Sequence, residues 1–319
     1  MSRKIDPRGT LAPEAVNTYS IFERKSKVSV EAFKKPYAPG SSFADFLESL
    51  PAFLQAEELK ALAEAIAAAH KNNKTVALAM GAHNIKVGLG PLYADLMERG
   101  IITSVALNGA GIVHDFELAL AGHSSEEVGD VLGAGRFGMA AETSSWLNRV
   151  IKEGYARGKG IGEAVGEAIW EENLPHRGKS LLAAAYKNKV MATVHVAIGT
   201  DIIHMHPSMD GEATGGGPPP PFPRSCALRR GRSGRACMSL WSAVGLPEIF
   251  LKALTLVRNL GHEVSGFTTA DLDFIRNYRP GVNVVGRPTS GGGRGIRLTG
   301  PHEILVPLLF ASVLDKVGR

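Results

Sequence analysis

Two neighbouring segments of the chain repeat the same order of apolar and polar positions. Residues 75–80 (TVALAM) are almost entirely apolar, the turn GAHN follows at 81–84, and an amphipathic segment continues to Gly100. A second apolar run at 101–107 leads into the turn NGAG at 108–111 and a further helical segment. Short apolar runs that end at glycine-rich turns predict buried strands, and a 3.6-residue period predicts helices. Two such units in succession predict a right-handed βαβ crossover within a parallel sheet.

The turn at 108–111 is the first candidate for a ligand site. Glycine lets the backbone approach a ligand closely, and the N-terminus of the following helix offers free N–H groups and a partial positive charge that suit a phosphate. Ligands of doubly wound sheets bind at the carboxyl ends of the strands, where this turn is expected. The alternative is a turn that uses glycine for its geometry alone. The G-x-G-x-x-G match at 133–138 follows the polar segment 123–130 instead of a strand, so we do not assign it to a dinucleotide.

Length and composition predict a large core and an enzyme of the α/β class. With 319 residues, 44% of them hydrophobic, the chain can bury the core of one large domain or of two small ones. Its 37 glycines suit the many turns between apolar segments. We therefore predict a doubly wound, mostly parallel sheet with helices on both faces.

The ends of the chain and its cysteines predict a cytoplasmic protein without a membrane partner. The N-terminal residues MSRKIDPRGT contain no apolar leader. The most apolar run, 304–314, is too short to span a bilayer and contains Pro307. Two cysteines cannot form a disulfide framework, which fits a reducing compartment.

Residues 215–241 differ in composition from the rest of the chain. They include five prolines, five arginines and both cysteines, and no Asp, Glu or Lys. Without these arginines the chain has 31 basic and 31 acidic residues, so the net charge of +5 arises here and does not indicate a nucleic-acid partner. We interpret the segment as the product of a compensated frame error in a GC-rich coding sequence; a plain loop and a basic arm for RNA, a membrane or an acidic partner are the alternatives. A buried strand needs a nearly continuous apolar run, so we expect an exposed loop here and a sheet that lacks a strand beside Ser242.

Four stretches carry a resemblance to a known family. The chain resembles the deoxyhypusine synthases, most closely the bacterial branch of deoxyhypusine synthase-like proteins, from about residue 42 to the end apart from 215–241. The stretches are LAMGAHNIKVGLGPLYADLMERG, NGAGIVHDF, KNKVMATVHVAIGTDIIHMHPSMDG and VNVVGRPTSGGGRGIRLTGPHEILVPLL. We therefore divide the chain into an N-terminal extension, 1–41, and a single α/β domain, 42–319, that the segment 215–241 interrupts.

The resemblance implies a Rossmann-like NAD-binding fold and a homotetramer with active sites between paired subunits. Members of the family oxidise spermidine with tightly held NAD, release diaminopropane and pass the aminobutyl group to an acceptor amine. They then reduce the product with the same NADH. The implied activity is that of an alkyl-group transferase, whose partners are a polyamine and other copies of the chain.

The resemblance also implies which residues bind the cofactor. Asp201 matches an aspartate whose carboxylate faces NAD, and His114 falls where some members have Glu and others His, so His114 is the candidate catalytic residue. The residues that match the NAD-binding turns are His83, Asn84, Asn108, Gly109, Ala110, Asp201, Thr269, Ala270, Gly300, His302 and Glu303.

The family's catalytic lysine has no counterpart near the turn SGGGRG at 290–295. The matching position holds Arg294 or Gly295, and no lysine occurs between Lys252 and Lys316. A guanidinium is always protonated and cannot form a Schiff base. The expected acceptor is therefore a small amine instead of a protein lysine. The alternative is a non-catalytic relative that keeps the dinucleotide site without turnover.

A metal site is a rival interpretation of the segment around His204 and His206. On a strand, an H-x-H pair places both imidazoles on one face, where they could share a metal ion. Further potential ligands lie nearby in the sequence: His195, Asp201, Asp210 and Glu212. We favour the simpler interpretation, polar residues at the rim of a cleft, and assign no metal.

Overall fold

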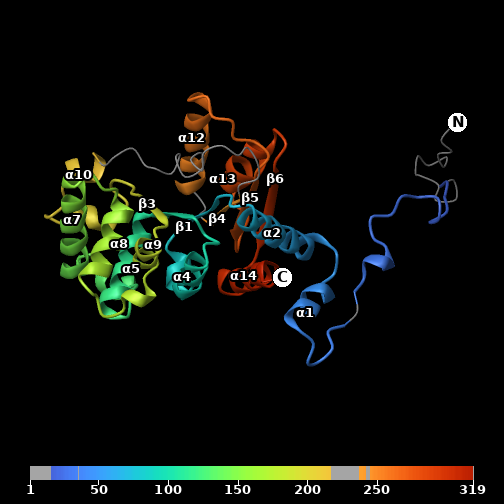
Figure 1. Ribbon diagram of the computed structural model, residues 1–319, viewed down its shortest axis with the longest axis horizontal. Helices are drawn as coiled ribbons and strands as arrows, with labels where there is room; N and C mark the ends of the chain where they lie inside the picture. The colour runs from blue at the N-terminus through green and yellow to red at the C-terminus, as the bar shows by residue number, and fades with distance from the viewer. Residues whose placement is uncertain (1–15, 35, 217–236, 242–244, 319) are drawn as a thin grey trace, which may run out of the picture. The chain divides into compact units, whose positions relative to one another are not determined.

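In the part of the chain that the structure describes, six strands form one sheet with the order β3-β2-β1-β4-β5-β6 (Figure 1). The computed structural model describes residues 16–34, 36–216, 237–241 and 245–318, with the backbone alone for 237–241. All neighbouring strands pair in parallel. The strands are β1 (Val76–Met80), β2 (Ser104–Asn108), β3 (Met191–His195), β4 (Cys237–Trp241), β5 (Thr268–Asp273) and β6 (Arg294–Thr299).

Helices connect these strands and follow the last of them. The longer ones are α2 (Leu54–Lys71), α4 (Gly90–Glu98), α5 (Gly109–Ala121), α7 (Ala141–Ala156), α8 (Ile161–Glu171), α12 (Gly245–Asn259) and α14 (His302–Val317). Shorter helices and helical turns are α3 (His83–Lys86), α6 (Val128–Leu132), η3 (Arg177–Lys179), α9 (Leu181–Lys187), η4 (Ile202–Met205), α10 (Gly211–Gly215), α13 (Tyr278–Pro280), η5 (Gly281–Gly286) and η6 (Arg287–Thr289).

The strand order and the helices on both faces confirm the predicted doubly wound α/β fold. From β1 the chain moves outward through β2 to β3, and from β4 it moves the other way through β5 to β6. One apolar core joins a face of the sheet to helices that include α2, α4, α5, α8, α9 and α14. On the opposite face, Ala77, Ala79 and Ala106 pack against Leu246 and Phe250 of α12. Such small alanines allow α12 to lie close to the centre of the sheet.

The central position of β4 corrects the prediction of a missing strand. Residues 237–241 (CMSLW) pair in parallel with β1 on one side and with β5 on the other. Four of these five residues are apolar, which suits a strand that is buried on both faces. The prediction treated 215–241 as one block and overlooked the apolar run 237–241. A missing strand therefore no longer supports the interpretation of this segment as a frame error. The remainder of the expected loop, 217–236, lies outside the described residues.

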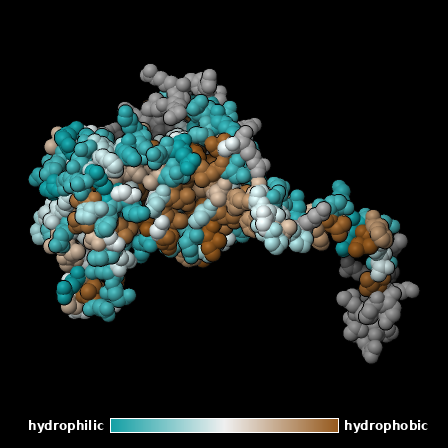
Figure 2. All heavy atoms as spheres, turned by 60° about the horizontal axis from the view of Figure 1, so that its bottom comes forward, coloured by the Kyte–Doolittle hydropathy of each residue, from teal (hydrophilic) through white to brown (hydrophobic). Residues whose placement is uncertain are grey.

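Apolar residues on nearly all sides of the segment 302–316 predict a buried closing helix. The closing helix α14 has almost these bounds, but it is buried on one side only. Its inner side holds buried Val306, Leu309 and Phe310, whereas the side chain of Ile304 is 61% exposed. Figure 2, which brings the side of α14 forward, shows hydrophobic side chains gathered on this surface. Among the described residues, no helix combines the length and the apolar character that crossing a bilayer requires.

The chain divides into two compact units, Met1–Phe53 and Leu54–Arg319, and the second contains the whole sheet. In the first unit, α1 (Phe43–Ser49) begins with a capping box. The Ser42 hydroxyl accepts a hydrogen bond from the backbone N–H of Asp45, and the Asp45 carboxylate accepts one from the N–H of Ser42.

A buried carboxylate ties α5 to α9. Asp115, 1% exposed, accepts hydrogen bonds from the Ser180 hydroxyl at 2.6 Å and from the backbone N–H groups of Leu181 at 2.7 Å and Leu182 at 3.0 Å. Burial raises the pKa of Asp115, and these three donors act in the opposite direction. The carboxylate thus stabilises the first turn of α9 and fixes α5 beside it.

We expect the substitution Asp115→Asn to lower the free energy of unfolding by about 1 to 3 kcal/mol, because an amide NH₂ would face a backbone donor in a buried place. Urea unfolding followed by circular dichroism measures the change. The matched control is Asp95→Asn, which removes an exposed i,i+4 pair with Arg99 and should leave the urea midpoint almost unchanged. Equal midpoints for the two variants would contradict the role given to Asp115.

Candidate functional site

The carboxyl edge of the sheet, between β1 and β4, is the candidate functional site. At this point the chain's connections diverge, toward β2 on one side and toward β5 on the other. In doubly wound folds, the helices that follow such strands lie on opposite faces, and ligands bind outside the strand ends at this point. Residues from the ends of β1, β2, β3, β5 and β6 gather at this edge, as the following contacts establish.

The end of β2 brings Asn108 and Gly109 together with Asp201. Asn108 is the N-cap of α5, and its Oδ1 accepts a hydrogen bond from Gly111 N at 3.0 Å, so the helix begins directly after the strand instead of after a four-residue turn. A Cβ atom at Gly109 would lie 2.0 Å from Oδ2 of Asp201, so the Asp201 carboxylate can hold this position only beside a glycine. The same Oδ2 accepts a hydrogen bond from Ala197 N at 2.7 Å. Asp201 therefore lies against the start of α5.

This contact changes the chemistry expected at the helix start. The partial positive charge of the α5 N-terminus already faces the Asp201 carboxylate, and the Asn108 side chain occupies one of its N–H donors. A phosphate placed there would meet a like charge. A carboxylate at this position suits the hydroxyls of a ribose, which donate hydrogen bonds, or an ammonium group. In place of a phosphate, we therefore expect a hydrogen-bond donor of the ligand at this turn. Ala110, another predicted cofactor contact, is half-buried in the same first turn of α5.

The end of β1 joins β2 to the other half of the sheet. Gly81 follows β1, and a Cβ atom built on it would lie 3.7 Å from Nδ2 of Asn108. His83 begins α3 and is exposed, with its ring 5.3 Å from that of His302 and 6.2 Å from that of Phe274. Thus His83 and His302, predicted from segments far apart in the sequence, lie together.

The neighbours of His302 belong to the last two strands. The His302 side chain is only 4% exposed, and its Nε2 atom lies 2.9 Å from the carbonyl oxygen of Leu272 in β5. Gly300 follows β6, and its N–H donates to the Asp273 carbonyl at 3.0 Å. Glu303 is exposed in the first turn of α14. These residues place the start of α14 at the carboxyl edge, as predicted.

Asn84 is buried beneath this edge and carries an unpartnered donor. Its Oδ1 accepts a hydrogen bond from the Tyr93 hydroxyl at 2.9 Å, while Nδ2 is buried without a hydrogen-bond partner. Burial raises the pKa of Tyr93 well above its usual range, so the phenol stays a donor at neutral pH. An orphaned amide N–H₂ beside glycine-lined strand ends fits a ligand that accepts hydrogen bonds, as a dinucleotide does.

Two predicted cofactor contacts are not at a turn. Thr269 and Ala270 lie inside β5, fully buried, and the Thr269 hydroxyl donates to the Val284 carbonyl at 2.8 Å. The strand continues to Asp273, so the segment was assigned a turn too early. Neither side chain can reach a ligand at the carboxyl edge, because the core surrounds both.

Sequence reasoning missed Asp271, Asp273 and Arg297 on the face of the sheet that α12 covers. The alternation of Thr269, Asp271 and Asp273 could have indicated this polar face. Asp271, 2% exposed, lies 3.3 Å through Oδ2 from Nε of Arg297 on β6, and its Oδ1 has no hydrogen-bond partner. Mainly through burial, the pKa of Asp271 rises to about 6. Gly281 makes room for the guanidinium, because a Cβ there would lie 1.8 Å from Nη2 of Arg297.

The rival metal site is not supported by the geometry. His204 belongs to the 3₁₀ turn η4 and not to a strand, so the strand on which the rival interpretation relied is not formed at His204. The other proposed ligands have separate partners: Asp210 pairs with Lys152, Glu212 with Tyr155, His195 with Thr193 and His206 with Ser208. Nowhere in the described ranges do three metal-ligating side chains come together.

The position matched to the family lysine lies at the other edge of the sheet. Arg294 is the first residue of β6, is exposed, and pairs with Glu58 at 3.1 Å. Gly295 has no room for any side chain, because a Cβ would lie 2.2 Å from the Val285 carbonyl oxygen. Six residues of strand, about 17 to 20 Å, separate this end from the carboxyl edge. The identity of residues 294 and 295 therefore does not decide the chemistry at the carboxyl edge.

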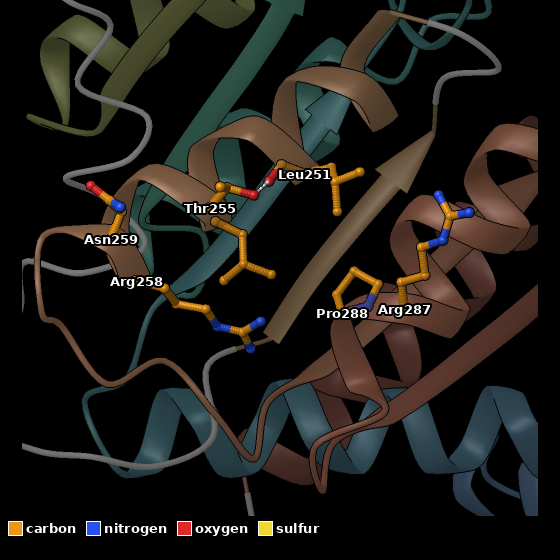
Figure 3. A pocket seen from close by; sticks show the side chains of 7 residues that line it. Leu251, Thr255, Arg258, Asn259, Arg287 and Pro288 are labelled. Carbon is orange, nitrogen blue, oxygen red and sulfur yellow. Dashed lines mark hydrogen bonds between the residues drawn. The ribbon is translucent and has the colours of Figure 1, made fainter.

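A cavity of about 530 Å³ also lies at the amino edge, near the end of α12 (Figure 3). Its guanidinium groups bond to neutral oxygens, Arg258 to the Val264 carbonyl and Arg287 to Oδ1 of Asn283. It is lined by Leu251, Leu254, Thr255, Arg258, Asn259, Arg287 and Pro288. None of the predicted site residues lines it, so it is separate from the carboxyl-edge site.

Comparison with known proteins supports the fold. A "putative deoxyhypusine synthase" from Entamoeba histolytica superposes with a TM-score of 0.50 at 10% identity, over 88% of this chain and 96% of its own. AgrE in complex with ornithine and NAD⁺ superposes with a TM-score of 0.50 at 13% identity, over 82% of this chain and 34% of its own. The chain spans about a third of AgrE and of ArgZ, a cyanobacterial arginine dihydrolase with a TM-score of 0.49 at 14% identity and 82% coverage of this chain. No protein-family model and no curated protein sequence matches the chain.

Two side chains on the α12 face, the half-buried His195 and the buried Asp271, predict opposite effects of pH on stability. The pKa of His195 falls to about 4 through burial, so the unfolded state binds more protons and stability rises from pH 4 toward 6.5. The pKa of Asp271, raised to about 6, makes stability fall between pH 4 and 6. Relative to the native sequence, Asp271→Asn should therefore steepen the rise of unfolding free energy with pH, and His195→Gln should flatten it. Urea unfolding at several pH values measures both; curves parallel to that of the native protein would contradict these assignments.

Proposed function

We propose that this protein is an NAD-dependent enzyme that transfers an aminoalkyl group, such as the aminobutyl group of spermidine, to a small acceptor amine. The single observation that carries the proposal is the gathering of Asn108, Gly109, Asp201, His83 and His302 at the carboxyl edge where the strand order diverges. This is where doubly wound folds bind dinucleotides. The resemblance to deoxyhypusine synthases supplies the reaction class, and the AgrE neighbour is a protein of this fold that binds NAD⁺ and an amine.

The residues at this edge fit a dinucleotide because they offer hydrogen-bond acceptors and donors and because two of them are glycines. Asp201 would accept hydrogen bonds from ribose hydroxyls, and Gly81 and Gly109 leave the backbone open to close approach. The orphaned Nδ2 of Asn84 would find an acceptor. NAD supplies, when bound, reversible acceptance of a hydride from the carbon beside an amine nitrogen.

The charges near the site favour a cationic substrate. Asp201 lies at the edge itself, and Asp273 is the last residue of β5 at the same edge. Carboxylates attract the ammonium groups of a polyamine, and a partly buried site strengthens that attraction.

Binding and turnover of NAD test the proposal. Saturating NAD⁺ should raise the melting temperature, since a ligand that binds only the native state stabilises it. With spermidine and putrescine, the protein should form a new polyamine without net accumulation of NADH, because the hydride leaves and returns. Mass spectrometry of the amines and absorbance of NADH measure the two outcomes.

The matched variants are Gly109→Ala and Gly133→Ala. A methyl group at 109 would displace the Asp201 carboxylate, whereas the space around Gly133 is empty. Gly109→Ala should therefore lose the thermal shift with NAD⁺, and Gly133→Ala should keep it. An unshifted melting temperature in the native protein would overturn the proposal. A shift without any polyamine product would favour the non-catalytic relative.

We further propose that the protein forms a homo-oligomer, a tetramer by resemblance, through the outer side of α14. Ile304 is 61% exposed and Pro307 is also exposed on this helix, and large apolar side chains on a surface mark interfaces. Ile304→Glu should lower the molar mass measured by light scattering to that of a smaller assembly, while Glu303→Gln in the same turn should not. A monomeric native protein would contradict the proposal.

A further inference from the structure

A chain of hydrogen bonds links His114 to a carboxylate through a serine. The Ser124 hydroxyl donates to Oε2 of Glu117 at 2.6 Å, and Nδ1 of His114 lies 2.5 Å from the same hydroxyl oxygen. The other carboxylate oxygen of Glu117 accepts a hydrogen bond from the Thr143 hydroxyl at 2.9 Å. The His114 and Glu117 side chains are 17% and 21% exposed, so water competes little with these bonds.

The direction of these bonds fixes the tautomer of the imidazole. Because the single hydrogen of the Ser124 hydroxyl goes to Glu117, the oxygen can only accept from His114. The ring hydrogen must therefore sit on Nδ1, which leaves the lone pair on Nε2. A carboxylate 3.9 Å from Nδ1 also stabilises the ring once it becomes cationic.

The hydrogen-bonded residues His114, Ser124 and Glu117 lie near the carboxyl edge of the sheet. His114 is in the second turn of α5, which starts at the end of β2, and Lys86 at the end of α3 is close enough to influence its charge. The loop that carries Ser124 is connected through Gly138 to η4, which begins one residue after Asp201. In this loop Glu126 accepts a hydrogen bond from Gly138 N at 2.7 Å, and a Cβ atom on Gly138 would lie 2.8 Å from Cγ2 of Ile202.

We propose that His114 is the general base for amine oxidation at this site, and that Ser124 and Glu117 are positioning residues that present Nε2 to the substrate. The inference rests on the proposed function. In the step, Nε2 takes a proton from the secondary ammonium of the donor polyamine, and the neutral amine then gives a hydride from its adjacent carbon to NAD⁺. The products are the substrate iminium ion, NADH and the imidazolium of His114, so charge and atoms balance.

The charges around His114 suit this role. Burial lowers the pKa of His114, with a further lowering by Lys86 and an opposing effect of Glu117. The ring is therefore neutral at physiological pH and free to accept a proton. Once the His114 ring has accepted a proton, the negative charge of the Glu117 carboxylate, which is linked to the ring through Ser124, stabilises the imidazolium.

The tautomer of His114 tests the chain of bonds without any substrate. In ¹⁵N NMR spectra of the full-length protein at neutral pH, the His114 ring should carry its hydrogen on Nδ1; the resonances are assigned by their loss in His114→Gln. Ser124→Ala should move the hydrogen to Nε2, whereas Ser124→Thr, which keeps the hydroxyl, should not. A hydrogen on Nε2 in the native protein would overturn the proposal.

Single-turnover reduction of NAD⁺ by spermidine tests the catalytic role. His114→Gln should slow hydride transfer by about 100-fold or more, and Glu117→Gln should slow it and shift the acidic limb of the pH–rate profile to lower pH. Glu126→Gln, which loosens the same loop without touching the chain of bonds, should leave that limb in place. An unchanged limb in Glu117→Gln would refute the positioning role. If the native protein does not reduce NAD⁺ at all, the proposed function fails, and the NMR result still decides the arrangement of His114.

Discussion

The candidate site depends on the parallel pairing of β1 with β2. Leu78 and Val105 are partners in this register, as are Met80 and Leu107, so the two strands end at the same edge. Their following segments start side by side, which brings Gly81 to 3.7 Å from Asn108. A register shift would separate them and turn the fully buried side chains of β1 to the wrong face. The order of the sheet then adds the ends of β3, β5 and β6 to the same edge.

Electrostatics refines what this edge can bind. The start of α5 would attract a phosphate if it stood alone, but Asp201 lies against it and supplies the negative charge from within the chain. The site is thereby better matched to donors such as hydroxyl and ammonium groups. The glycine at 109 serves this contact with Asp201, and not only the bend between strand and helix.

Two titratable side chains on the sheet face that α12 covers, Asp271 in β5 and His195 in β3, both favour their neutral forms. Burial favours the neutral form of both Asp271 and His195, which raises the pKa of the acid and lowers that of the base. Arg297 compensates part of the cost for Asp271. These two groups make the sheet face beneath α12 more sensitive to pH than the apolar face opposite.

The class of fold, the two strand–helix units around Gly81 and Gly109, and the closing helix could be predicted from the sequence, because apolar periodicity and glycine positions act locally. Asn108, Asp201, His83 and His302 could also be identified as candidate site residues from the sequence. Each ends or follows a strand, and the carboxyl ends of parallel strands meet at one edge of the sheet. Tertiary structure alone decided that Thr269 and Ala270 lie inside β5 and that residues 237–241 form the central strand. It alone paired Asp271 with Arg297 and linked His114 to Glu117 through Ser124. These depend on which strands become neighbours and on how a loop folds back over a helix, and such contacts between distant residues leave no periodic pattern in the chain.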